Sequence, residues 1–132
     1  MLVLVDTSVW IEHFQRGEPT LAGMLENGAV FTHPMVMGEI ACGQLRNRER
    51  IFGYLRTLPK AKPASDQEVF HLLEENRMWG RGVGWIDLHL LASALLTPCY
   101  FWTLDKRLAE SAALLGVKGI SAPAREMSIP AT

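Results

Sequence analysis

Four carboxylates occupy places in this sequence where a lone charge would be costly. They are Asp6, Glu39, Asp87 and Asp105, and each lies beside or within an apolar stretch. A charge in such a setting is stable only when it is paired or bound to a cation. Carboxylate oxygens are the ligands that Mg²⁺ and Mn²⁺ accept, and no Cys-x-x-Cys or Cys/His ligand spacing accompanies them. The four acids therefore predict a site for a hard divalent cation.

The chemistry of such a site follows from its charge. Carboxylates packed together repel one another, and the repulsion raises their pKa values until a divalent cation relieves it. The cation can then make a nucleophile from water and hold a phosphate oxygen, which favours phosphodiester hydrolysis. Three hydroxyls next to the acids could orient water or phosphate, namely Thr7, Ser8 and Thr103. Arg81, in the glycine-rich segment Gly80–Gly84, could reach a phosphate.

Each of these residues also has a simpler structural explanation. Asp6 and Asp105 precede predicted helices and could be N-caps. Asp87 could be the acid that complements a helix dipole. Glu39 could extend from its helix into solvent, and Ser8 could be a cap. No single residue decides between the two explanations, but four acids in comparable settings favour a functional site.

The apolar patterns predict the elements that position these acids. Strands are expected at about 2–5, 29–32, 99–104 and 117–120, with helices between them, and Ser65 and Glu68 have the spacing of a capping box. Strands that alternate with helices predict an α/β fold, a three-layer sandwich with a central, mostly parallel sheet. Right-handed crossovers bring the strand C-termini to one edge, where Asp6 and Asp105 would lie. We expect one domain over residues 1–132, with a tail from about 121.

Charge is distributed unevenly along the chain. The net charge of −1 gives no argument for nucleic acid. However, residues 1–40 are acidic and contain Arg16 as their sole Lys or Arg, whereas residues 44–62 are basic and contain Glu49 as their sole acid. These neighbouring segments could seat a cation and a polyanion side by side, although the basic run could equally be a solvated helix face.

The cysteines and the N-terminus predict a cytoplasmic protein. Cys42 lies in a helical pattern and Cys99 in a strand pattern, and we expect both to be buried thiols in a reducing compartment. The chain begins directly with a strand and shows no leader segment. Its apolar runs are too short to span a membrane, so we expect no membrane association.

Four segments of the chain resemble the motifs of PIN-domain ribonucleases, specifically the toxins of VapB/VapC-type toxin–antitoxin pairs. They are Leu4–Ile11, Met35–Gly43, Trp85–Ala94 and Thr103–Leu108. The resemblance extends from Leu2 to about Ile120. One departure is in the third motif, which often has Ile-Ala-Ala where this chain has Leu91-Ala92-Ser93.

This resemblance implies a PIN fold with Mg²⁺ or Mn²⁺ in an acidic pocket. It implies Asp6, Glu39, Asp87 and Asp105 as the catalytic and metal-binding acids, with Asp6 and Asp87 foremost among the direct ligands. It also implies metal-assisted hydrolysis of RNA, a homodimer, and an antitoxin partner that inserts a segment to block the pocket. The leading hypothesis is therefore a metal-dependent endoribonuclease toxin.

Two other classes of function compete with this hypothesis. The first is a catalytically silent PIN module that binds RNA or another protein, against which the four intact acids argue. The second is a phosphoacceptor receiver domain, which also has acids at strand ends. Receivers carry an acidic pair at the first strand, whereas Asp6 has no acidic neighbour.

Overall fold

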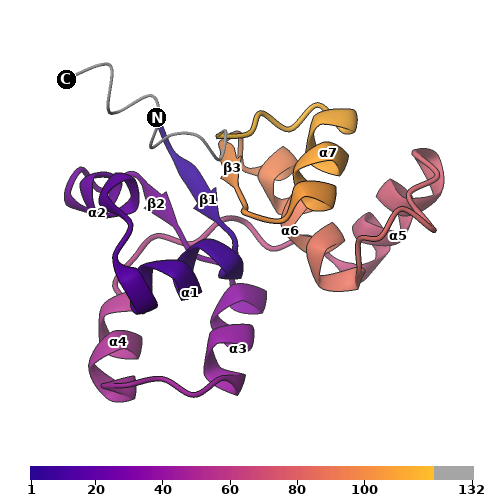
Figure 1. Cartoon of the computed structure of the whole chain (residues 1–132). Coiled ribbons are helices and arrows are strands. Elements are labelled where there is room, and N and C mark those ends of the chain that lie inside the picture. The colour runs from indigo at the N-terminus through magenta and orange to yellow at the C-terminus, as the bar shows by residue number, and fades with distance from the viewer. Residues whose placement is uncertain (121–132) are drawn as a thin grey trace.

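A short parallel sheet lies at the centre of the molecule (Figure 1). Its strands, in spatial order, are β2 (Val30–Phe31), β1 (Val3–Val5) and β3 (Tyr100–Trp102). Val3 pairs in parallel with Val30 on one side and with Tyr100 on the other. Every residue of β1 is fully buried, as expected for a strand covered on both faces. The computed structural model describes residues 1–120, and the tail predicted from about 121 lies outside them.

The helices surround this sheet. They are α1 (Thr7–Arg16), α2 (Pro19–Glu26), α3 (Pro34–Cys42), α4 (Arg48–Leu55), α5 (Asp66–Glu75), α6 (Trp85–Leu96) and α7 (Lys106–Leu114). In Figure 1, α2 lies beside β2, α1, α3 and α4 lie below the sheet, and α5 and α7 lie on the side of β3. The α/β fold with a central parallel sheet is therefore confirmed.

Helix α6 connects the two parts of the core. Every residue from Leu88 to Ala94 on this helix is buried. Its residues Leu90 and Leu91 belong to the main core around the sheet, and Leu88 and Ala92 form a smaller cluster with α5. Asp87 stands immediately before this buried stretch, so the packing of α6 sets the position of its carboxylate.

The last strand expected from the sequence does not form. The predicted strand at 117–120 is reduced to one parallel bridge between Phe101 and Gly119, with the Phe101 amide donating to Lys118 O at 2.9 Å. The chain meets the sheet edge too briefly there to form a strand.

The expectation that both cysteines are buried was also wrong. Cys42 is exposed because it ends α3, and Cys99 is half-buried. Within residues 1–120, no helix has the length and hydrophobicity that a membrane span requires.

A buried histidine joins α3 to α6. The Nδ1 atom of His33 caps α3 by accepting from the Met35 amide at 3.0 Å, so the ring proton resides on Nε2, which lies 2.8 Å from Ser93 Oγ. His33 is 1% exposed. Burial, and secondly the charge of nearby His89, lowers the pKa of His33 to about 4.

This histidine predicts a loss of stability in acid. The unfolded chain takes up the proton near pH 6.5 and the folded chain only near pH 4, so the stabilisation is present above pH 6.5 and declines as the pH falls towards 4. We expect about 3 kcal/mol to be lost between pH 7 and pH 4. Urea denaturation at both pH values measures it. His33→Gln, which cannot titrate, should lose less, and an equal loss in both proteins would contradict this assignment.

Candidate active site

Asp6 stands at the carboxyl edge of the sheet, between the end of β1 and the start of α1. Its amide donates to Trp102 O of β3 at 2.9 Å, and the residue is 6% exposed. It occupies the N-cap position of α1, but its side chain makes no capping hydrogen bond. Its Oδ2 atom instead accepts from Ser8 Oγ at 2.8 Å and from Thr103 Oγ1 at 2.7 Å. The capping explanation of Asp6 therefore fails, and two hydroxyls orient its carboxylate.

These hydroxyls tie the segment after β3 to the same site. Ser8 Oγ accepts from the Leu104 amide at 3.0 Å, and Thr103 Oγ1 accepts from the Asp105 amide at 3.0 Å. Each hydroxyl thus donates to Asp6 and accepts from a backbone amide. Their role in this structure is to hold the two acidic segments together.

Glu39 reaches the site from α3. Its Oε1 atom accepts from Thr7 Oγ1 at 2.7 Å, although Glu39 itself is exposed. Thr7 is the first residue of α1 and directly follows Asp6. The predicted hydroxyls Thr7, Ser8 and Thr103 therefore all contact predicted acids, and Glu39 does not simply extend into solvent.

The other two acids accept hydrogen bonds at helix N-termini, as expected for the cap proposed at Asp105 and for the dipole-complementing acid proposed at Asp87. Asp87 Oδ2 accepts from the Gly84 amide at 3.1 Å, and Asp105 Oδ1 accepts from the amides of Arg107 at 2.9 Å and Leu108 at 3.2 Å. Each cap uses one carboxylate oxygen. The second oxygen of each has no hydrogen bond within residues 1–120, so capping does not exclude a further ligand.

The carboxylate of Asp87 lies within the electrostatic influence of the other three acids. The pKa of Asp87 is raised first by burial, a rise that the hydrogen bond from Gly84 opposes. The charges of Asp6, Asp105 and Glu39 raise it further. Asp87 is therefore close enough to be repelled by three carboxylates that come from separate parts of the chain. A cation placed among them would relieve this repulsion.

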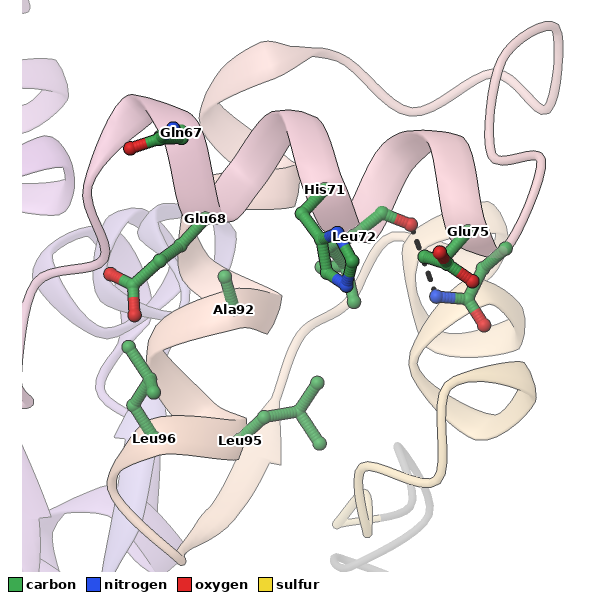
Figure 2. A pocket seen from close by; sticks show the side chains of 9 residues that line it. Gln67, Glu68, His71, Leu72, Glu75, Ala92, Leu95 and Leu96 are labelled. Carbon is green, nitrogen blue, oxygen red and sulfur yellow. Dashed lines mark hydrogen bonds between the residues drawn. The ribbon is translucent and has the colours of Figure 1, made fainter.

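The four acids Asp6, Glu39, Asp87 and Asp105 are called the acidic edge from here on. They do not form a closed metal cage. Among the described residues, no group of three or more His, Cys, Asp or Glu is arranged to hold a metal ion. Mg²⁺ is usually bound through one or two carboxylates and keeps several waters, so the donor set still fits this ion. A groove of about 670 Å³ lies elsewhere, between α5 and α6, where Glu68 and His71 face Leu95 and Leu96 (Figure 2). None of the four acids lines it.

Arg81 lies in the glycine-rich loop before α6. Its Nε atom donates to Arg77 O at 3.2 Å, which holds the side chain along the loop and leaves the terminal guanidinium nitrogens without a partner in the described part of the chain. A contact that sequence reasoning missed lies beside it: the side chain of Arg107 packs on Gly82. No local pattern relates residues so far apart in sequence, and the glycine at position 82 is the one signal of a close approach.

The fold and the sequence together define the class of protein. The sequence matches the PIN domain over residues 3–114, and the chain belongs to this family. It is 38% identical over 117 residues to Ribonuclease VapC32 of Mycobacterium tuberculosis, which covers 88% of this chain and 94% of the relative. The resemblance of the chain to the PIN-domain family is therefore confirmed.

Solved structures show the same fold at low sequence identity. VapBC-1 from nontypeable Haemophilus influenzae has a TM-score of 0.69 and 14% identity over 92% of this chain and 98% of that one. FitAcB from Neisseria gonorrhoeae has a TM-score of 0.61 and 12% identity over 91% and 97%.

Proposed function

We propose that this chain is a metal-dependent endoribonuclease toxin that hydrolyses RNA phosphodiester bonds at the acidic edge. The observation that carries the proposal is the convergence of the acidic segments at the sheet edge, where Ser8 and Thr103 bond to Asp6 and Thr7 bonds to Glu39. Such a group is poised to bind a divalent cation. The 38% identity to a relative named as a ribonuclease supports RNA as the substrate.

The proposed metal ion is Mg²⁺, with Mn²⁺ as its substitute. Asp6 and Asp87 are the proposed direct ligands, because Asp6 is held rigidly and Asp87 has a carboxylate oxygen outside its cap. Glu39 and Asp105 would bind the waters that the ion retains. When bound, the ion supplies an activated water and neutralises charge on the scissile phosphate.

The chain's own residues fix the geometry of this reaction. Ser8 and Thr103 lock the rotamer of Asp6, and Thr7 holds Glu39 over the start of α1. A site oriented in this way needs little reorganisation during the reaction. Arg81 is proposed to help position the RNA backbone through its terminal guanidinium nitrogens.

Cleavage by the chain purified without a partner tests this function. We expect tRNA or rRNA to be cut in the presence of Mg²⁺ or Mn²⁺ and to remain intact with EDTA. Sequencing of the ends of the products would locate the phosphodiester bond that is cleaved. If no substrate were cleaved above the level of an Asp6→Asn chain, the proposal would be wrong.

Thr103→Val isolates the support that the β3–α7 segment gives to Asp6. Valine keeps the shape of threonine but removes the hydrogen bond to Asp6 and the acceptor for the Asp105 amide. We expect kcat/KM for RNA to fall about 10- to 100-fold, the range typical of residues that orient metal ligands. Thr57→Val is the matched control, since Thr57 bonds only to Tyr54 O at the end of α4. Equal activity in both variants would remove Thr103 from the site.

We also propose an antitoxin partner and a homodimer. The solved VapBC-1 structure is a neighbour in fold and supports the choice of partner. Co-expression with the product of a small neighbouring reading frame should suppress RNA cleavage, and a partner that binds without suppressing it would contradict this role. Light scattering should give twice the chain mass for the purified protein, whereas a monomeric mass would contradict the dimer.

A catalytically silent PIN module is the second candidate. One observation favours it: the described residues contain no ready-made cluster of three metal ligands. Calorimetric titration with Mn²⁺ separates the two candidates. Binding that disappears in Asp6→Asn supports the ribonuclease, and the absence of binding supports the silent module.

A further inference from the structure

The side chain of Arg107 contacts a glycine that belongs to a distant part of the chain. It is the second residue of α7, and its side chain packs on Gly82 in the loop before α6. A Cβ at position 82 would lie 2.7 Å from Arg107 Cδ, 2.7 Å from Nη1 and 3.3 Å from Nε. The arginine therefore occupies space that any other residue at position 82 would fill.

Arg107 is an exposed residue and has no charged partner among residues 1–120. In this described part of the chain its guanidinium makes neither an ion pair nor a hydrogen bond. By contrast, Arg16 pairs with Glu12 at 2.6 Å, and Arg48 donates to Ala41 O at 2.6 Å. The side-chain donors of Arg107 thus have no hydrogen-bond partner among residues 1–120, although the side chain is packed.

The two segments that Arg107 joins both carry acids of the site. Its own amide donates to Asp105 Oδ1 at 2.9 Å, and Gly82 is two residues before Gly84, whose amide donates to Asp87. The acidic group would otherwise repel a polyanion such as RNA. A free cation beside it offsets that repulsion.

We infer that Arg107 binds a backbone phosphate of the RNA next to the scissile bond, and that Gly82 is glycine in order to leave room for it. The inference rests on the proposed ribonuclease function. Packing on the loop limits the rotamers of the arginine, so less entropy is lost when its planar fork binds phosphate. Gly82 also has a φ of +80°, which favours glycine on its own account. A substitution at this position therefore has two effects, a steric contact with Arg107 and backbone strain, and the experiment must separate them.

Kinetics of RNA cleavage by single and double variants test the inference. Arg107→Gln should lower kcat/KM about 10- to 100-fold, mainly through KM, and Arg107→Lys should fall between this variant and the wild type. The slope of log kcat/KM against log salt should become shallower by about 0.7, as expected when one contact to single-stranded RNA is lost. Lys118→Gln is the control for net charge, because it lies at the opposite end of the sheet beside Tyr100. It should match the wild type.

Glycine substitutions test the space that Arg107 occupies. Gly80→Ala and Gly82→Ala both place alanine at a positive φ, +73° and +80°, but only position 82 faces Arg107. Both should lower the melting temperature similarly, whereas only Gly82→Ala should raise KM. In the Arg107→Gln background, Gly82→Ala should have no further effect on KM, because the two changes remove the same contact.

A binding measurement keeps this inference separate from the catalytic proposal. Fluorescence anisotropy of a short RNA with Asp6→Asn and with Asp6→Asn/Arg107→Gln should show weaker binding by the second chain. Equal binding, or an Arg107→Gln chain with wild-type kcat/KM and salt slope, would overturn the role of Arg107. A wild-type chain that cleaves no RNA would overturn the ribonuclease proposal instead, and the binding comparison would still decide the role of Arg107.

Discussion

Asp6→Asn should lower the rate of RNA cleavage about a thousandfold, roughly 4 kcal/mol of transition-state stabilisation. Asparagine has the shape of aspartate, and its oxygen can still accept from Ser8 and Thr103. The fold should therefore be preserved, and the loss should come from the missing charge at the metal site. Single-turnover cleavage of a defined RNA with saturating Mn²⁺ measures the effect.

A matched acid outside the site controls this result. Glu110→Gln on α7 makes the same change of charge at an exposed position. It should leave cleavage within about twofold of the wild type, as is usual for surface changes. If Asp6→Asn retained a tenth of the wild-type rate, Asp6 would not be a direct metal ligand.

Asp87→Asn should change stability in opposite directions with and without metal. The pKa of Asp87 is raised in the folded chain, so the folded chain binds the proton more tightly than the unfolded chain does. Ionisation of Asp87 therefore destabilises the metal-free fold progressively as the pH rises from the ordinary pKa through the raised one. Asparagine removes this cost, so the metal-free variant should melt at a higher temperature than the wild type at pH 7.

The effect of Mn²⁺ should be the reverse. At about 100 times its dissociation constant, a ligand stabilises the folded state by about 2.7 kcal/mol. We expect the wild-type chain to gain about this much and Asp87→Asn to gain almost nothing. Thermal denaturation with EDTA and with Mn²⁺ measures both. Equal gains would show that Asp87 does not bind the ion, and a destabilised metal-free variant would show that the carboxylate repulsion is unimportant.

Local sequence patterns predicted most of the secondary-structure elements well. The run at β1 is buried throughout, and the capping box of Ser65 and Glu68 forms both of its hydrogen bonds, at 3.1 Å and 2.8 Å. Both features depend on residues within one short segment. The arrival of Asp6 at the sheet edge followed from the direction of a buried parallel strand.

Features that depend on distant residues could not be predicted in this way. Ser93 replaces the more usual alanine of the third motif, and only the structure places its hydroxyl 2.8 Å from Nε2 of His33 on α3. The predicted last strand failed because the sheet edge offers a single bridge at Phe101. The contact of Arg107 with Gly82 likewise depends on how α7 sits against the loop before α6. Such contacts arise from tertiary packing and leave no periodic signal.

Crystals grown with Mn²⁺ offer the most direct test of the claim that the four acids form a cation site. The anomalous difference map should contain a peak roughly 2.1 Å from carboxylate oxygens of Asp6 and Asp87, with Glu39 and Asp105 reached through water. The same crystals of Asp6→Asn should lack it. A map without a peak at this edge, or with its strongest peak at Glu68 and Glu75 in the groove between α5 and α6, would contradict the proposed site.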